Sequence, residues 1–202
     1  MLLAIDTSSG TSVAVVDRDA GVLAEHTEAD TRRHAEVVGL LIERSLADAG
    51  VTASDLSGVA VGMGPGPFTG LRVGIAAART FAFGTGRPLV PVVSHDALAF
   101  AHADAVAIIT DARRREVYWS EYDAPDELGL PRRIRGPEIA RPDELETALP
   151  RLEHAPVSAG ALGMLAERLY AAGRPFADDR ALYLRSPDVT MSASNRGARR
   201  VS

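Results

Sequence analysis

A carboxylate and three hydroxyl side chains follow the first apolar run of the chain. Asp6 comes directly after residues 2–5 and is followed by Thr7, Ser8 and Ser9. A carboxylate with hydroxyls on a tight turn can hold a hydrated Mg²⁺ and a nucleotide phosphate. The same groups can instead satisfy their own backbone in an Asx or ST turn. The residues favour these two interpretations equally.

A second acidic turn follows the apolar run at residues 106–109. Asp111 is its carboxylate, but Ala112 stands where a glycine would let a phosphate approach closely, which weakens a nucleotide interpretation. The three arginines at 113–115 form a local positive patch that could contact RNA or an acidic partner. Exposure around a hairpin is the commoner explanation for such a patch.

The remaining residues give little support for catalysis by this chain. His95 has Ala99 four residues later, so the H-x-x-x-H spacing of a metal site is absent. Cysteine and lysine are both absent, which excludes thiolate catalysis, disulfides, Schiff bases and a P-loop lysine. No G-x-S-x-G nucleophile elbow occurs. We therefore expect no catalytic residue and no metal site.

A Gly/Pro-rich loop at residues 62–74 joins an apolar strand to a long apolar segment. Pro65 and Pro67 stiffen it and remove two amides that a phosphate cradle would use. The loop therefore predicts either a ligand or partner site, or a rigid connector. Thr69 stands where a helix N-cap hydroxyl is expected. The loop residues that open this helix are Gly64, Gly66, Thr69 and Gly70.

Length and composition predict a soluble cytoplasmic protein of one large or two small domains. The chain has 202 residues and a net charge of −5, so the whole molecule does not attract nucleic acid. No run of eighteen uncharged apolar residues occurs, and the N-terminus has no basic region that would mark a signal peptide. We expect no membrane association.

Apolar periodicity predicts an α/β protein. A strand, an acidic turn and a second strand occur twice, around Asp6 and around Asp111, which suggests two related lobes. We expect an N-terminal lobe at 1–95, a smaller lobe at 96–187 and a disordered tail at 188–202. The expected strands are 2–5, 12–16, 21–25, 59–61, 89–93, 106–109, 116–122 and 157–159. The expected helices are 33–49, 71–83, 94–101 (capped by Ser94), 142–149 and 162–172.

Two of these helices carry more apolar surface than one sheet can cover. The helix at 33–49 has an apolar sector wider than a normal stripe, and the helix at 71–83 is apolar almost throughout. Gly70, Gly74 and Ala78 form a stripe of small residues that would let another helix approach. The second apolar side predicts contact with another protein, and complete burial within the monomer is the alternative.

Several segments together resemble the TsaB family, small proteins of the bacterial machinery that makes tRNA threonylcarbamoyladenosine. The resemblance covers residues 1–125, and the long Gly/Pro motif is its most specific part. It implies a two-lobed actin, Hsp70 and sugar-kinase-like fold, each lobe a mixed sheet with flanking helices. The segments that carry it are 5–8, 34–36, 64–74, 111–118 and 183–185.

The resemblance also implies a non-catalytic role. A TsaB-like chain pairs with a TsaD-like catalytic subunit through a helical bundle, and a TsaE-like ATPase joins the pair. With threonylcarbamoyl-adenylate made by TsaC, the complex modifies adenosine 37 of tRNAs that read ANN codons. The resemblance implies that ATP, Mg²⁺ and tRNA are used by the complex, with no cofactor bound tightly by this chain. The same apolar helix surface predicts a homodimer when TsaD is absent.

The resemblance assigns specific residues to these roles. TsaD has a metal-binding pair of histidines four apart, so Ala99 after His95 implies a dismantled metal site. Asp6, Thr7 and Asp111 then form a vestigial nucleotide site. The predicted interface residues are Val38, Leu41, Ile42, Arg72, Val73, Ala76 and Ala77. The residues leave two alternatives: a free-standing Mg-ATP-dependent phosphotransferase or ATPase that uses Asp6 and Asp111, and a glycoprotease.

Overall fold

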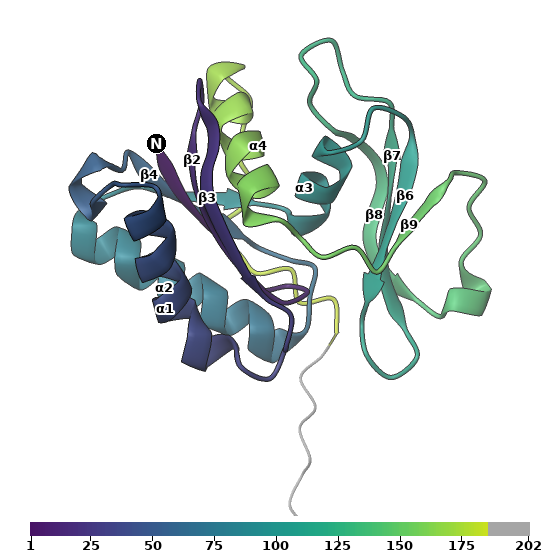
Figure 1. Ribbon diagram of the computed structural model, residues 1–202. Coiled ribbons are helices and arrows are strands. Elements are labelled where there is room, and N and C mark those ends of the chain that lie inside the picture. Colours follow the sequence, from purple (N-terminus) through teal and green to yellow (C-terminus); the bar gives the residue numbers. More distant parts are fainter. Residues whose placement is uncertain (186–202) are drawn as a thin grey trace, which may run out of the picture.

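The computed structural model describes residues 1–185 and has two β-sheets with flanking helices (Figure 1). The first sheet is five-stranded, in the order β3-β2-β1-β4-β5. β1 pairs antiparallel with β2 and parallel with β4, so the sheet is mixed. Its strands are β1 (Leu2–Asp6), β2 (Thr11–Asp17), β3 (Gly21–Glu28), β4 (Gly58–Gly62) and β5 (Leu89–Val92).

Alternation along β1 gives this sheet two apolar faces. Leu3 and Ile5 belong to the core beneath α1 (His34–Asp48) and α2 (Phe68–Thr85). Leu2 and Ala4 point to the opposite face, because successive side chains alternate along a strand. That face is covered by α4 (Ala159–Ala171) (Figure 1).

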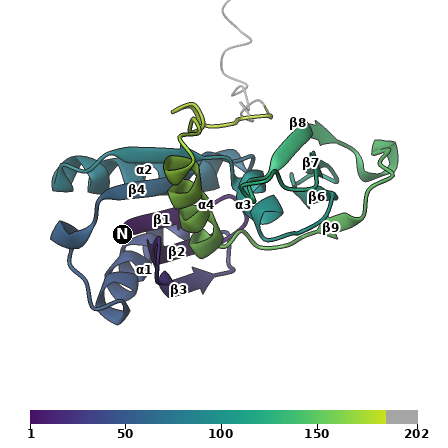
Figure 2. The ribbon, with the colours of Figure 1, turned by 90° about the horizontal axis from the view of Figure 1, so that it is seen from above.

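The second sheet is four-stranded, in the order β8-β7-β6-β9. β6 pairs antiparallel with β7 and parallel with β9, so this sheet is also mixed. The helix α3 (Ser94–Phe100) lies between the two sheets (Figure 2). The predicted α/β class with two mixed sheets is therefore confirmed. The strands are β6 (Val106–Asp111), β7 (Val117–Asp123), β8 (Arg132–Ala140) and β9 (Arg151–Glu153).

Several predicted elements in the second half of the chain are wrong. The helix expected at 142–149 is only a 3₁₀ turn, Pro142–Glu144. The strand expected at 157–159 is the start of α4, where the Ser158 hydroxyl accepts a hydrogen bond from the Ala161 amide as the N-cap. The strand β8 was missed because arginines and a Gly-Pro pair interrupt its pattern, and β9 is only three residues long.

Two predicted helix caps are also wrong. α2 begins at Phe68 with Pro67 as its N-cap, so Thr69 lies within the first turn. α3 has Val93 as its N-cap and no side-chain cap, and the Ser94 hydroxyl instead donates to Asp6. Ser94 is the first residue of α3 and Thr69 is the second residue of α2, so neither occupies the N-cap position.

The C-terminal part of the described chain runs from α4 back across both sheets. The Ala177 amide donates to the Pro91 carbonyl, and the Leu182 amide donates to the Met63 carbonyl. Further along, Arg185 forms an ion pair with Glu116, which lies in the hairpin between β6 and β7. We call residues 176–185 the C-terminal strap.

The described chain thus passes from the first sheet to the second and then returns. The division into lobes near residue 95 stays a prediction, and the tail predicted at 188–202 lies outside the described residues. Within residues 1–185, no helix is long and apolar enough to cross a membrane.

Candidate functional site

The Asp6 carboxylate is engaged inside the chain. One oxygen accepts hydrogen bonds from the Ser8 amide at 2.7 Å and the Ser8 hydroxyl at 2.6 Å. The other accepts the Ser94 hydroxyl at 2.6 Å. Burial raises the pKa of Asp6, while these hydrogen bonds act in the opposite direction. The turn has the Asx geometry that was one of the two interpretations of this segment.

Thr7 joins the Asp6 turn to α2. Its hydroxyl donates to the Gly70 carbonyl at 2.8 Å and accepts from the Gly74 amide at 3.1 Å. A Cβ on Gly74 would lie 2.2 Å from the Thr7 hydroxyl oxygen, and a Cβ on Gly70 would lie 2.7 Å from the Thr7 carbonyl. The stripe of small residues on α2 therefore accommodates this turn, and the prediction that it receives a partner's helix is corrected.

The Gly/Pro loop packs against the same turn. A Cβ on Gly66 would lie 2.9 Å from the Cα of Ser8. A Cβ on Gly64 would lie 2.9 Å from Leu71, and the Gly64 amide donates to the Ser94 hydroxyl at 3.1 Å. Tyr118 of β7 donates its hydroxyl to the Gly66 carbonyl at 3.2 Å. The loop is thus a packed connector that holds the Asp6 turn, α2 and the second sheet together.

His95 is a buried, neutral link between α3 and the second sheet. Its Nδ1 lies 2.8 Å from the Ser120 hydroxyl, and its Nε2 lies 2.8 Å from the Thr110 hydroxyl. Burial lowers its pKa to about 3. Ala99 is buried in the core behind it. No group of three or more His, Cys, Asp or Glu side chains in the described part of the chain is placed to hold a metal.

The Asp111 turn is a tight hairpin. Asp111 is exposed, and its carboxylate accepts the Arg113 amide at 2.8 Å. Arg113, Arg114 and Arg115 all have positive φ, between 55° and 65°, so the hairpin adopts a conformation that L-residues seldom take. Arg113 reaches across to donate to the Thr31 hydroxyl at 2.6 Å. The hairpin is thus tied to the first lobe.

Residues of both acidic turns line one cavity, but of the predicted vestigial-site residues Asp6, Thr7 and Asp111 only Asp111 lines it. Ser8 and Ser9 of the first turn face Thr110, Asp111 and Arg113 across it. The cavity holds about 110 Å³. Small-molecule sites usually enclose about 300–1,000 Å³, so a nucleotide would not fit without movement of the hairpin.

Other polar groups complete this region, and sequence reasoning missed them. Ser94 is the residue that bonds Asp6 from α3, although it lies far from the turn along the chain. His34 is buried at the start of α1, with Nδ1 2.8 Å from the Thr11 hydroxyl, and burial lowers its pKa. Neither hydrogen bond can be predicted from the neighbouring residues in the sequence, because each joins residues that are far apart along the chain. Chemically, these groups form a satisfied network that fixes the turn.

The outer sides of α1 and α2 form a separate candidate site. Leu40 is 54% exposed, and Phe83, at 91%, is the most exposed large apolar side chain within residues 1–185. Arg72 is also exposed, with its guanidinium 4.0 Å above the centre of the Phe68 ring. We define the outer helix face by the exposed residues Ala35, Gly39, Leu40, Arg72, Ala76 and Phe83, and charged side chains such as Glu36, Glu43 and Arg79 are exposed on the same helices.

The predicted interface residues divide into a buried group and a group that is at least partly exposed. Val38 and Leu41 are buried in the core of the first lobe. Of the others, three are half-buried and two are exposed. The half-buried ones are Ile42, Val73 and Ala77, and the exposed ones are Arg72 and Ala76. Helical spacing alone did not separate the core side of α1 from its free side, because its apolar sector is too wide.

Comparison with known proteins gives the family. The family model described as TsaD, tRNA N6-adenosine threonylcarbamoyltransferase, matches residues 14–146, more than half of the chain. The chain belongs to the TsaD family. The matched segment includes α1, α2, the Gly/Pro loop and the Asp111 hairpin.

Relatives within the TsaD family include TsaB proteins. The chain is 34% identical over 134 residues to the tRNA threonylcarbamoyladenosine biosynthesis protein TsaB of Escherichia coli, covering 64% of this chain and 57% of that protein. It is 45% identical over 123 residues to an uncharacterized protein of Mycobacterium tuberculosis, covering 60% of this chain and 58% of that protein. The matches thus span little more than half the length of these curated relatives.

A solved structure extends the similarity beyond the sequence matches. A Pseudomonas aeruginosa protein described as uncharacterized, with similarity to peptidase YeaZ, aligns with a TM-score of 0.78 and 28% identity. The alignment covers 91% of this chain and 99% of that one. The two-lobed arrangement is therefore shared with a crystal structure over nearly its full length.

Proposed function

We propose that this chain is a non-catalytic subunit of the machinery that places a threonylcarbamoyl group on N6 of adenosine 37 in tRNAs that read ANN codons. Its role would be to bind and activate a TsaD-like catalytic subunit. The E. coli relative, a tRNA threonylcarbamoyladenosine biosynthesis protein, supports this assignment.

The observation that carries the proposal is the exposed apolar surface of the outer helix face. Phe83 and Leu40 stand free on α2 and α1, with small residues such as Ala76 and Gly39 on the same two helices. Small side chains let a second pair of helices approach closely, and large ones supply apolar area. Such a surface suits a helical bundle formed with another subunit.

The hydrogen bonds of Asp6 and His95 support a non-catalytic role. A free-standing phosphotransferase would need Asp6 to hold Mg²⁺, but its oxygens already accept hydrogen bonds from Ser8 and Ser94. A glycoprotease with a metal would need a free imidazole, whereas both nitrogens of His95 face hydroxyls. The geometry therefore favours the subunit role over both alternatives.

The remaining partners follow from the same assignment. We propose that a TsaE-like ATPase joins the pair, that ATP, Mg²⁺ and tRNA are used by the complex, and that this chain binds no cofactor tightly by itself. Without its partner, the outer helix face of two copies would pair in a homodimer, because that buries the same apolar side chains.

Charge substitution on the outer helix face tests the proposal. Ala76→Arg places a charge at the centre of the exposed side of α2 without disturbing the core. Val73→Glu and Ala77→Arg do so at half-buried positions, where folding must be checked by circular dichroism. Burying an unpaired charge costs several kcal/mol, so each change should abolish a micromolar complex with a TsaD-like subunit from the same genome.

A matched control separates this surface from exposed apolar residues in general. Ile134 on β8 is 59% exposed and lies on the second sheet, so Ile134→Arg should leave binding unchanged. Co-purification and light scattering would measure the complex. Retention of the complex by folded Ala76→Arg protein would show that the assigned surface is wrong.

A further inference from the structure

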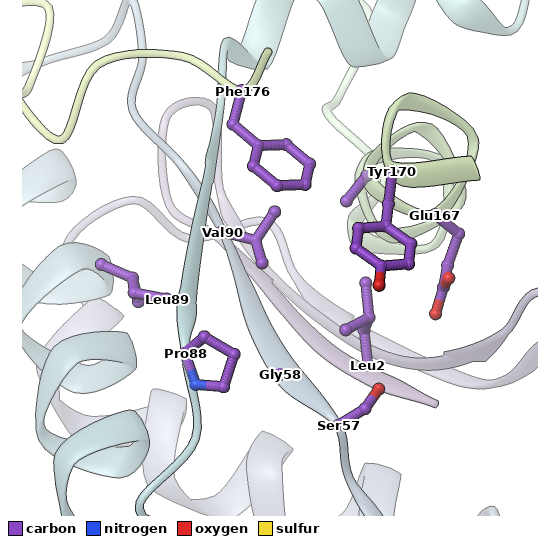
Figure 3. A pocket seen from close by; sticks show the side chains of 10 residues that line it. Leu2, Ser57, Gly58, Pro88, Leu89, Val90, Glu167, Tyr170 and Phe176 are labelled. Carbon is purple, nitrogen blue, oxygen red and sulfur yellow. The ribbon is translucent and has the colours of Figure 1, made fainter. Parts of the chain in front are cut away.

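A cavity of about 360 Å³ lies on the face of the first sheet opposite α1 and α2 (Figure 3). Its walls come from the starts of three parallel strands and from the last turns of α4. Leu2, Val90 and Phe176 give it an apolar floor and wall, and Pro88 closes one side (Figure 3). Its volume lies within the range of small-molecule sites.

Three polar groups stand at the rim of this cavity. They are the Ser57 hydroxyl, the Glu167 carboxylate and the Tyr170 hydroxyl (Figure 3). Glu167 and Tyr170 lie three residues apart on α4, so they share one side of the helix. The Ser57 hydroxyl donates to the Met1 carbonyl at 2.8 Å and accepts from the Met1 ammonium at 3.4 Å, so it is already engaged within the chain.

The charges at the rim favour a positively charged ligand. Glu167 is the one charged side chain that lines the cavity, and Arg168 follows it in the last turn of α4 but is not among the lining residues. It belongs to the C-terminal end of α4, where the helix dipole adds negative potential. The Tyr170 ring is 72% exposed and offers an aromatic face to a cation. The Met1 ammonium is the nearest positive group recorded at the rim, 3.4 Å from the Ser57 hydroxyl oxygen, so we place the ligand's ammonium at the Glu167 end of the cavity.

We propose that this cavity binds a small organic amine with an apolar or aromatic body. The body would lie on Leu2, Val90 and Phe176, and the ammonium would lie between the Glu167 carboxylate and the Tyr170 side chain. The site is separate from the outer helix face, because the two surfaces lie on opposite faces of the first sheet (Figure 1). It does not depend on the proposed function.

Titration of the full chain with phenethylammonium chloride, followed by amide NMR, tests this site. Saturable shifts are expected at the amides of residues 57–58, 89–90 and 167–176, with a Kd of about 1 mM for so small a ligand. Phenylacetate and 2-phenylethanol have the same apolar body with a negative and a neutral head, and both should bind more weakly than the amine.

Two variants and a control locate the site. Glu167→Gln removes the charge without changing the shape and should weaken amine binding about fivefold, as expected for a partly exposed charge pair. Tyr170→Ala removes an exposed ring and should weaken it by a similar factor. Glu43→Gln, on the exposed side of α1, should leave the Kd unchanged.

Three results would overturn the proposal. One is the absence of saturable shifts around the cavity, and another is phenylacetate binding as tightly as the amine. The third is an unchanged amine Kd in folded Glu167→Gln protein. Amine binding that fails while a TsaD-like partner still binds would leave the proposed function intact.

Discussion

Asp6 and His95 both direct their hydrogen-bonding groups to neighbours inside the chain. Asp6 is bonded by Ser8 and Ser94, and His95 bridges Thr110 and Ser120. At the scale of single residues, these side chains stabilise the junction between the lobes. Their contribution to the free energy of unfolding, and its dependence on pH, can therefore be measured.

The buried state of His95 predicts a pH-dependent stability. Its pKa is about 3 in the folded chain and about 6.5 when unfolded, so the unfolded chain binds more protons between these values. The contribution of His95 is complete above about pH 6.5 and falls by about 1.4 kcal/mol per pH unit as the pH drops toward 3.

Urea unfolding at pH 7, 6 and 5 would measure this effect in the wild type and in His95→Gln. The difference between the two cancels the contributions of other groups, such as Asp6 and Asp96, whose pKa values burial raises. The stability of His95→Gln should therefore fall less steeply than that of the wild type as the pH drops from 7 to 5. Equal slopes for both proteins would contradict a buried neutral imidazole.

Thr7 gives a second prediction at this scale. Thr7→Val keeps the shape but removes the hydroxyl that bonds Gly70 and Gly74, and should lower the free energy of unfolding by about 1 kcal/mol. Thr80→Val, on the exposed side of the same helix, should change it far less. Denaturant unfolding measures the free energy of unfolding of both variants. Equal losses would mean that the buried Thr7 hydroxyl stabilises the fold no more than the exposed Thr80 hydroxyl.

At the scale of elements, α2 has one side fitted to the Asp6 turn and another side free. Gly74→Ala would place a Cβ 2.2 Å from the Thr7 hydroxyl oxygen, and should destabilise the chain by about 1–3 kcal/mol. Gly84→Ala meets nothing within 4 Å and should stabilise it by about 0.5–1 kcal/mol. Thermal or denaturant unfolding should show that Gly74→Ala lowers the stability and that Gly84→Ala raises it. A change in the same direction for both variants would contradict this assignment of the helix sides.

Side-chain contacts hold the C-terminal strap against α2, and each contact can be removed separately by mutation. The Phe68 and Tyr183 rings lie 4.8 Å apart, and Arg79 pairs with Asp179 at 2.7 Å. Phe68→Ala should loosen the strap and speed hydrogen exchange at the Leu182 amide, by about tenfold at most. Exchange in the core of β1 should not change. An unchanged rate at Leu182 would mean that the ring pair does not hold the strap.

How well the elements could be predicted depended on their local pattern. Continuous apolar runs such as β1 and β4 were found, because a strand buried on both faces has a strong signal. β8 was not found, because it lies at the edge of its sheet and because three arginines and a Gly-Pro pair break its apolar pattern. The candidate site was found at Asp6 and Asp111 but not at Ser94, because that contact depends on tertiary packing alone.

At the scale of the whole molecule, the two lobes are joined by polar contacts while one outer surface stays apolar. Tyr118 bonds the Gly/Pro loop, and Arg113 bonds Thr31, so the lobes are connected on both sides of the small cavity. The sequence predicted a surplus of apolar surface on α1 and α2. It could not show which side of each helix is free, since Val38 and Leu41 proved to be core residues.

Side-chain footprinting of the outer helix face tests the central proposal most directly. Hydroxyl-radical labelling of this chain, alone as a dilute monomer and with a TsaD-like subunit, would report the exposure of Phe83 and Leu40. We predict strong protection of both in the complex and unchanged labelling of Tyr170, which lies on the opposite face of the sheet. Unchanged labelling of Phe83 and Leu40 in a formed complex would contradict the proposal.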